Sequence, residues 1–378
     1  MKYEQHNPLP IPASGPFAHV KATIDTVFDW QYALKQQHLL QLYEKGKAAT
    51  WNASDLDWST DVDVEKIAVL RQQASGGGLM NRLLNPPRDL DEREAVMLNL
   101  HMNSFMLSQF LHGEQGALVA TAKIVQTVPW EEAKFYAANQ VADEARHVEV
   151  YHRYLTEKLG INYPVHPSLQ QLLDDIITDA RWDVTYLGMQ IMVEGLALAA
   201  FGMLKMMMPE EPLIQDITTR IMGDESRHVA FGVMSLEDLY TKEMSAAELK
   251  EREEFVIEAT HLLRDRLLMH QVFERLGWPV ETWVKWSNDT PFMKGFRQMT
   301  FSKIVPNLKR LGLLTPRVRE EYAKLDLLRF EHLKDSVDEP EPTPPAELVQ
   351  LLMQFLAASA QGQPGAPGGP GGPAVAAR

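Results

Sequence analysis

Apolar residues recur along most of the chain at the three- to four-residue spacing of a helix face, and no stretch shows the alternation of a half-buried strand. This pattern predicts four long helical stretches at about 91–128, 130–159, 169–208 and 213–241, each ended by proline or glycine. The third is expected to break near Ala180. At roughly 1.5 Å per residue, each stretch can span a bundle ~40 Å long. We therefore expect an all-α fold, a four-helix bundle with additional flanking helices.

The additional helices are expected on both sides of these four stretches. A capped turn region with two tryptophans is predicted at 51–58, where Asn, Ser and Asp residues interrupt the helical pattern. The flanking helices are predicted at about 17–48, after Asp63, at 245–276 and at 293–313.

Proline and glycine set the expected limits of the domain. Residues 1–16 are predicted to form an extended N-terminal arm because four prolines prevent a helix there. Residues 338–378 are a Pro/Gly-rich tail, predicted to be largely disordered apart from a short apolar helix at about 346–358. The intervening residues, 17–337, are expected to form one helical domain with a metal-binding bundle at about 91–241.

Composition excludes several kinds of chemistry. The net charge is −14, from 51 acidic and 37 basic residues, and no dense basic run occurs, which argues against nucleic acid or an anionic membrane as a partner. The chain has no cysteine, so disulfides, iron–sulfur clusters, thiolate zinc sites and cysteine nucleophiles are excluded. No signal-peptide pattern is present, and we expect a cytoplasmic protein.

One signature occurs twice, as Asp143-Glu-Ala-Arg-His147 and as Asp224-Glu-Ser-Arg-His228. A Glu and a His three positions apart lie on one face of a helix, close enough to hold one metal ion. Two such helices can supply two ions. A single Glu-x-x-His motif usually lies on a solvated helix face, so the repetition is what favours a metal site.

Two further glutamates stand alone in long uncharged stretches. Glu114 is the only formally charged residue in 95–122, and Glu194 is the only one in 184–204. An ionised carboxylate inside apolar packing must be neutralised or paired, and a metal ion does this directly. The alternatives are a paired core charge or, for 184–204, a membrane span, which the central glutamate and the missing basic flanks disfavour. We expect both glutamates to bridge the two ions.

The order along the chain is Glu, Glu-x-x-His, Glu, Glu-x-x-His, which is the arrangement of di-iron carboxylate bundles. Within each half the two ligand helices are one hairpin apart, and the longer link between the halves suits a crossover connection. The predicted metal ligands are Glu114, Glu144, His147, Glu194, Glu225 and His228.

These motifs resemble the ferritin-like di-iron carboxylate superfamily over about residues 40–240. The doubled Asp-Glu-x-Arg-His is most similar to bacterial multicomponent monooxygenases and soluble acyl-carrier-protein desaturases. Tyr151, four residues after His147, is similar to a tyrosine of the ribonucleotide reductase small subunit, as are Phe201 after Glu194-Gly and the Trp51-x-x-x-Asp-Leu-Asp segment.

The resemblance implies roles for residues next to the ligands. Asp143 and Asp224 match acids that orient the metal-bound imidazoles. Arg146 and Arg227 would pair with nearby carboxylates, or form ordinary surface or inter-helix salt bridges.

The chain departs from the monooxygenases and desaturases at one position. They carry a threonine within one turn after the third-helix glutamate, and Ala197 and Leu198 stand there instead. Proton delivery would then need another group, such as Gln190 or Thr185. An additional histidine ligand from His101, His112, His38 or His261 is a minor alternative.

The resemblance implies a non-haem O₂-activating oxygenase or oxidase that acts on a small or apolar organic substrate by hydroxylation, N-oxygenation or desaturation. It implies two iron ions, with Mn/Fe also possible, and an electron donor such as a ferredoxin or a flavin reductase. A homodimer is also expected. The alternatives are a radical-generating protein in which Tyr151 is redox-active, and a non-enzymatic iron-binding protein. Apolar residues near the site either pack the core or line a substrate pocket.

Overall fold

The computed structural model describes residues 17–63, 66–67, 85–338, 349–351 and 353–354. Within these residues every element of regular secondary structure is a helix. The all-α fold class is therefore confirmed. The expected arm at 1–16 and nearly all of the expected tail and its helix lie outside the described residues.

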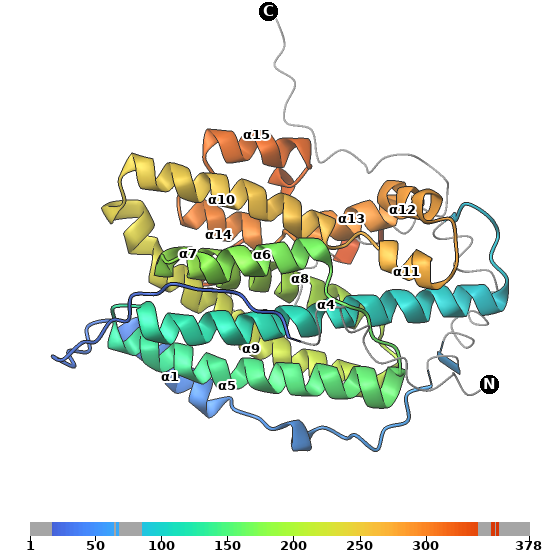
Figure 1. Cartoon of the computed structure of the whole chain (residues 1–378), viewed down its shortest axis with the longest axis horizontal. Helices are drawn as coiled ribbons and strands as arrows, with labels where there is room; N and C mark the ends of the chain where they lie inside the picture. The colour runs from blue at the N-terminus through green and yellow to red at the C-terminus, as the bar shows by residue number, and fades with distance from the viewer. Residues whose placement is uncertain (1–16, 64–65, 68–84, 339–348, 352, 355–378) are drawn as a thin grey trace, which may run out of the picture.

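The bundle is formed by α4 (Glu92–Thr127), α5 (Glu131–Arg153), α8 (Glu194–Met207) and α9 (Pro212–Asp238). The helices α4 and α5 lie side by side as one antiparallel hairpin, and α8 and α9 form a second (Figure 1). The helix α1 (Gln37–Ala48) packs against both α5 and α9. The predicted four-helix bundle is present, with additional helices around it.

Local sequence explains where the bundle helices begin. The Asp91 carboxylate accepts the N–H of Glu94 at 2.8 Å, and the Glu94 carboxylate accepts the N–H of Asp91 at 3.2 Å, so α4 starts in a capping box. The helix α9 starts with Pro212 in its first turn, and the Glu211 carboxylate accepts the N–H groups of Leu213 and Ile214. These caps fix the ends of the hairpins that carry the candidate ligands.

The third predicted stretch is broken near Ala180, as expected. It consists of α6 (Pro167–Thr178), α7 (Trp182–Tyr186) and a π-helical segment, η3 (Leu187–Val193), that leads directly into α8. At the break, the buried Lys123 ammonium donates to carbonyl oxygens at the end of α6. A π-helical segment rotates the residues that follow it about the helix axis, and here the first residue that follows is Glu194.

The residues after α9 form a layer over one side of the bundle (Figure 1). The predicted helix at 245–276 is divided in two between residues 265 and 270, and the predicted helix at 293–313 is likewise two helices. Two helices, α12 and α15, were not predicted. The layer consists of α10 (Ala246–Asp265), α11 (His270–Arg275), α12 (Val280–Asp289), α13 (Pro291–Met299), α14 (Ile304–Arg310) and α15 (Pro316–Lys324).

The shorter segments complete the described structure. Two further π-helical turns extend α5 and α9, and two 3₁₀ turns lie outside the bundle. These segments are η1 (Ala53–Asp55), η2 (Tyr154–Leu159), η4 (Leu239–Glu243) and η5 (Leu328–Phe330). The first of them is the capped turn predicted at 51–58, in which the N–H of Asn52 donates to the Asp55 carboxylate at 2.8 Å.

The prediction of one helix over 17–48 was wrong for its first half, because α1 begins only at Gln37. Phe17, Phe28 and Trp30 in the preceding segment are largely exposed, so no apolar face of that segment is buried against the bundle. Tyr32 has a φ of 52°, which a helix cannot contain. The helix expected after Asp63 lies mostly outside the described residues.

In the described part of the chain, one helical stretch, from Trp182 to Met206, is long and apolar enough to span a membrane. Its most apolar window is 94% buried inside the protein. The core helix of a soluble protein has the same length and composition, so these properties are weak grounds for a membrane span.

A buried ion pair connects the outer layer to the bundle. Arg252 on α10 donates two hydrogen bonds to the Asp183 carboxylate on α7, at 2.8 and 2.9 Å, and the Tyr240 hydroxyl donates to the same carboxylate at 3.0 Å. Replacement Arg252→Ala leaves Asp183 buried without its cation. We expect a loss of about 3–5 kcal/mol in the free energy of unfolding, measured with chemical denaturant.

The exposed ion pair of Lys242 and Asp238 provides the matched control. Lys242→Ala should cost far less than Arg252→Ala, because solvent screens the exposed pair. Equal losses in the two variants would contradict a structural role for the buried pair.

Candidate metal centre

The bundle brings the six predicted ligands together in its interior, where none is more than 5% exposed. Glu114 lies midway along α4, and Glu194 is the first residue of α8. Each Asp-Glu-x-Arg-His motif lies within α5 or α9, so its Glu and His face the interior from one side of the helix. The set is thus assembled from all four bundle helices.

The first half of the cluster is centred on His147. Its Nδ1 lies 3.2 Å from Glu114 Oε2, 3.3 Å from Glu144 Oε2 and 3.2 Å from Glu225 Oε1. One potential ligand atom from each of these four residues lies within 4.8 Å of the others. Three carboxylates and one imidazole therefore converge on a volume that one metal ion can occupy.

The second half is centred on His228. Its Nδ1 lies 3.1 Å from Glu144 Oε1 and 3.6 Å from Glu225 Oε1. Glu194 completes this half, since its carboxylate lies within 4.8 Å of ligand atoms of Glu144 and His228. A second ion has one imidazole and at least two carboxylates available here.

The prediction that Glu114 and Glu194 bridge the two halves was wrong. Glu144 contacts His228 through Oε1 and His147 through Oε2, and Glu225 Oε1 is near both imidazoles. A Glu three residues before its His projects from the same helix face into the space between the two imidazoles. Glu114 of α4 belongs only to the half centred on His147, and Glu194 of α8 belongs only to the half centred on His228.

The outer nitrogens of the imidazoles contact aspartates, and the pairing crosses between the motifs. His147 Nε2 lies 3.2 Å from Asp224 Oδ2, and His228 Nε2 lies 3.2 Å from Asp143 Oδ2. Each aspartate thus contacts the histidine of the other motif. An imidazole that donates Nε2–H to a carboxylate keeps its Nδ1 lone pair free for a metal.

Both arginines pair with the aspartate of their own motif, Arg146 with Asp143 and Arg227 with Asp224. The arginine side chains are 14% and 20% exposed, so neither pair is an ordinary surface salt bridge. These contacts hold each aspartate as a charged acceptor. Trp51 Nε1 also donates to Asp224 Oδ2, at 2.7 Å.

Gln140 is a site residue that the sequence interpretation missed. Its Nε2 donates to Glu144 Oε1 and to Glu194 Oε1, both at 2.9 Å. Its position four residues before Glu144, on the same face of α5, is the signal that would have identified it. Asn139 also contacts this region, because its Nδ2 donates to Asp143 Oδ2 at 3.1 Å.

Three groups expected near the metals have different surroundings. Tyr151 is fully buried, its hydroxyl has no hydrogen-bond partner, and burial together with the Glu114 charge raises its pKa. Gln190 Nε2 donates to Thr121 Oγ1 at 3.4 Å, and the Thr185 hydroxyl donates to a backbone carbonyl of its own helix at 3.4 Å. Neither Gln190 nor Thr185 shows a contact with the six ligands.

The additional histidines contact a different part of the protein. His101 Nδ1 lies 2.5 Å from the Tyr163 hydroxyl, and His112 Nε2 lies 2.9 Å from the Tyr163 carbonyl oxygen. Neither belongs to a group of residues that could hold an ion. The alternative of a seventh ligand from these residues therefore has no support in the structure.

Burial and the charges of neighbouring groups together set the pKa values in the cluster. Burial, and then the Glu225 charge, raise the pKa of Glu114 well above its usual value, and the same two causes raise the pKa of Glu194. Burial alone would lower the pKa of His147, but the Glu114 charge and contacts with Asp224 outweigh it and raise the pKa. The metal-free cluster therefore retains protons that bound cations would displace.

The donor atoms fit a pair of transition-metal ions. Glu144 Oε2, Glu194 Oε2, both oxygens of Glu225 and His228 Nδ1 are buried without a hydrogen-bond partner. Several buried acceptor atoms without hydrogen-bond partners, gathered in one place, are unfavourable unless a cation binds them. Imidazole and carboxylate ligands suit iron and manganese alike. One glutamate from each of two helices and a Glu-x-x-His pair from each of the other two is the donor arrangement of dimetal carboxylate bundles.

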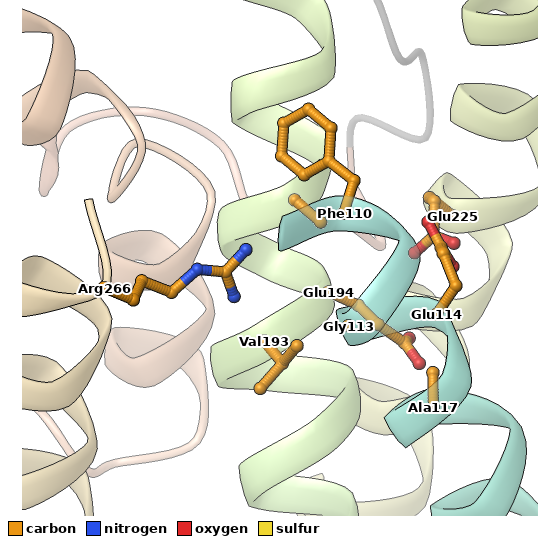
Figure 2. A pocket seen from close by; sticks show the side chains of 9 residues that line it. Phe110, Gly113, Glu114, Ala117, Val193, Glu194, Glu225 and Arg266 are labelled. Carbon is orange, nitrogen blue, oxygen red and sulfur yellow. The ribbon is translucent and has the colours of Figure 1, made fainter. Parts of the chain in front are cut away.

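A small cavity adjoins the cluster on the side of α4 and α8 (Figure 2). Its volume is about 10 Å³, which is space for one water molecule. Glu114, Glu194 and Glu225 form one side, Phe110 and Val193 contribute apolar walls, and Arg266 completes the lining from the outer layer.

No protein-family model and no curated protein sequence matches the chain. Two solved structures that are similar to it are mutants of an R2-like ligand-binding oxidase with an anaerobically reconstituted Mn/Fe cofactor. They are 17% and 15% identical, with TM-scores of 0.43 and 0.45, and each alignment covers 72% of this chain and 92% of the other. The likeness is weak, and the geometry described above comes from this chain alone.

The raised pKa values predict a pH dependence for the metal-free protein. A histidine whose pKa is raised on folding holds its proton more tightly in the folded state, so its contribution to stability is complete below 6.5 and is lost as pH rises through the raised value. Glu114 and Glu194 also hold their protons more tightly in the folded state, because their pKa values are raised. Their contribution to stability is therefore likewise lost as pH rises above 4.5.

We therefore expect the melting temperature of the metal-free protein to fall as pH rises from about 6.5 to 9. The metal-loaded protein should show a smaller fall, because metal ions replace the protons. Thermal melts of both forms across this range measure the difference. A metal-free protein that gains stability with rising pH would contradict the account.

Proposed function

We propose that the protein is a non-haem dimetal oxidoreductase that uses O₂ to oxidise a small or apolar organic substrate. The observation that supports this most is the pair of imidazole–carboxylate half-sites that share Glu144 and Glu225 inside an apolar bundle.

In this proposal Glu114 and His147 would hold one ion, Glu194 and His228 would hold the other, and Glu144 and Glu225 would contribute to both. Two bound iron ions, or one manganese and one iron, would supply the electrons that reduce O₂. Because neither half has more than one imidazole, the carboxylates balance most of the metal charge.

The protein's own groups then orient these ligands. Asp143 and Asp224 accept the Nε2–H protons, so each imidazole would bind a metal as a neutral ligand through Nδ1. Gln140 limits the rotation of Glu144 and Glu194. The apolar side chains around the cavity exclude bulk water, which protects reactive species from side reactions.

The finer assignments are part of the proposal. The oxidation could be a hydroxylation, an N-oxygenation or a desaturation, with electrons from a ferredoxin or a flavin reductase. Proton delivery by Gln190 or Thr185, a homodimeric state and a cytoplasmic location also stay predictions. Gln140 is a further candidate for orienting the ligands, since its amide already contacts two of the glutamates.

One observation favours a radical-generating role as a second candidate. The Tyr151 hydroxyl is buried without a partner, and the ring lies 6.2 Å from Phe110 and 5.9 Å from Phe201 between centroids. An apolar cage of this kind would protect a tyrosyl radical from solvent and reductants. The Glu114 charge raises the Tyr151 pKa, so this residue lies within electrostatic reach of the cluster.

Metal analysis of a matched pair of variants tests the proposed ligand set. Purified protein loaded anaerobically with iron(II) should contain two ions per chain and consume O₂ when reductant is present. His147→Ala should lose at least one ion and most of the O₂ consumption, because it removes the central donor of one half-site. His152→Ala, on an exposed position of the same helix, should behave like the wild type.

Two outcomes would reject parts of this proposal. Equal metal content in the two variants would show that His147 is not a ligand. Full metal content in the wild type without O₂ consumption would favour the non-enzymatic iron-binding alternative.

Electron paramagnetic resonance tests the second candidate. If Tyr151 is redox-active, the metal-loaded protein exposed to O₂ should show a tyrosyl signal that is absent in Tyr151→Phe. The control variant Tyr136→Phe removes another buried hydroxyl without a partner, one near His228, and should keep the signal. A wild-type protein without any tyrosyl signal would leave oxidation of an organic substrate as the function.

A further inference from the structure

A series of aromatic side chains begins beside the candidate metal centre and leads away from it on the His228 side. The Tyr136 ring lies 6.4 Å from the His228 ring between centroids. Phe231 follows at 4.4 Å from Tyr136, and Tyr186 lies 5.1 Å from Phe231. All three side chains are completely buried, and they come from α5, α9 and α7. Tertiary packing, and not a local motif, therefore brings these rings together.

Two tryptophans continue the series to the surface. The Trp182 ring lies 5.8 Å from the Tyr186 ring, and the Trp130 ring lies 5.3 Å from the Trp182 ring. Both indoles are half-buried, and Trp130 lines a cleft of about 430 Å³ beside the end of α9. The aromatic row, as we call the series, joins a candidate ligand to this cleft and consists of Tyr136, Phe231, Tyr186, Trp182 and Trp130.

The other aromatic side chains near the centre are arranged differently. Phe110, Tyr151 and Phe201 contact one another and form a closed group inside the bundle. Trp51, whose ring lies 6.4 Å from that of His147, is buried as well. Among the described residues, the aromatic row is therefore the path of ring contacts that joins the centre to a surface cleft.

Neighbouring rings favour the transfer of electrons. Electron tunnelling weakens steeply with distance, so a series of short steps is faster than one long step through aliphatic packing. Tyrosine and tryptophan also lose an electron more easily than most side chains, and the chain has no cysteine to compete with them. A centre that has been oxidised without substrate would otherwise attack the side chains next to it, so a path for electrons protects the protein.

The surroundings of Trp130 suit an indole that loses an electron. Among the described residues, the cleft carries more acidic than basic side chains, namely Glu237, Asp238 and Glu243 against Arg310. This excess of negative charge stabilises a positive charge on the ring, and the indole N–H proton can then pass to water in the cleft. Tyr136 cannot hold the charge in this way, because its buried hydroxyl has no hydrogen-bond partner to accept a proton.

We propose that the aromatic row carries electrons from the surface cleft to the metal centre when O₂ has oxidised the centre in the absence of substrate. In each transfer Trp130 loses one electron to the oxidised centre, and its indole N–H proton passes to water. A small one-electron donor in solution then restores the indole, which takes up a proton from water. This inference goes beyond the proposed function but rests on it, because only a redox-active centre can accept the electron.

Peptide mass spectrometry tests the proposal through the oxidation products of each tryptophan. The wild type is loaded anaerobically with iron(II) and then exposed to O₂ without substrate or reductant. Trp130 should be the tryptophan that is oxidised most. Trp30 is the internal control, because it is 74% exposed and a diffusible oxidant would attack it first. Protein loaded with zinc, which cannot change its oxidation state, should show no oxidation of Trp130.

Variants connect the oxidation to the aromatic row. Phe231→Leu keeps an apolar side chain in the core but removes the ring between the two tyrosines, so most of the Trp130 oxidation should be lost. Phe273→Leu is the matched control, since Phe273 is equally buried but packs against tryptophans of the outer layer, and it should behave like the wild type. Trp130→Phe should move the oxidation to Trp182, the preceding tryptophan of the row.

Several outcomes would overturn the role of the aromatic row. Oxidation of Trp30 to the same extent as Trp130, or equal oxidation of Trp130 in the zinc-loaded protein, would show that the oxidant does not reach Trp130 from the centre. Oxidation of Trp51 in place of Trp130 would show a different path. Equal Trp130 oxidation in Phe231→Leu and Phe273→Leu would show that the rings only pack the core. If Phe231→Leu does not fold, Trp130→Phe decides, because oxidation that does not move to Trp182 also overturns the row.

The same measurements separate this inference from the proposed function. A wild type that binds two ions and consumes O₂ without oxidation of any tryptophan overturns the aromatic row and leaves the proposed function standing. A wild type that binds no metal ions overturns the proposed function, and the role of the row with it.

Discussion

The structure depends on a concentration of negative charge in its interior. Four carboxylates meet within one buried cluster, and two unit charges 4 Å apart repel by about 4 kcal/mol even at an effective dielectric constant of 20. Protons or cations must therefore occupy the cluster for the bundle to be stable. The raised pKa values of Glu114 and Glu194 show that protons are retained in the metal-free cluster. The ligand atoms also converge on two points, where cations could take the place of these protons.

The doubled motif joins the two hairpins of the bundle. Asp224 of α9 contacts His147 of α5, and Asp143 of α5 contacts His228 of α9, so neither histidine is oriented by its own helix alone. The shared glutamates connect the halves a second time. Trp51 adds a third connection, because its indole N–H holds Asp224 from a segment far away in sequence. The geometry of either half-site therefore depends on the packing of both hairpins.

The sequence predicted most of the centre because the strongest constraints there are local. A Glu-x-x-His motif fixes two ligands on one helix face, and a lone Glu114 in an uncharged helix needs a partner wherever the helix packs. Proline and capping residues likewise fixed the starts of α4 and α9. These signals require no knowledge of tertiary structure.

The features that escaped prediction depend on tertiary structure. The position of Glu144 and Glu225 between the two histidines follows from how α5 and α9 face each other, which spacing does not reveal. Arg266 reaches the cavity from a separate layer, and nothing in its local sequence distinguishes it from a surface arginine. The segment before α1 has helical spacing but no surface to pack against, so tertiary context overrode its pattern.

Anomalous X-ray diffraction from crystals of the metal-loaded protein tests the central claim most directly. Data collected on both sides of the iron and manganese absorption edges locate each ion and identify it. The account predicts two peaks on either side of the Glu144 and Glu225 carboxylates, one beside His147 Nδ1 and the other beside His228 Nδ1. A single peak elsewhere, or carboxylates that remain in contact with one another with no peak between them, would contradict it.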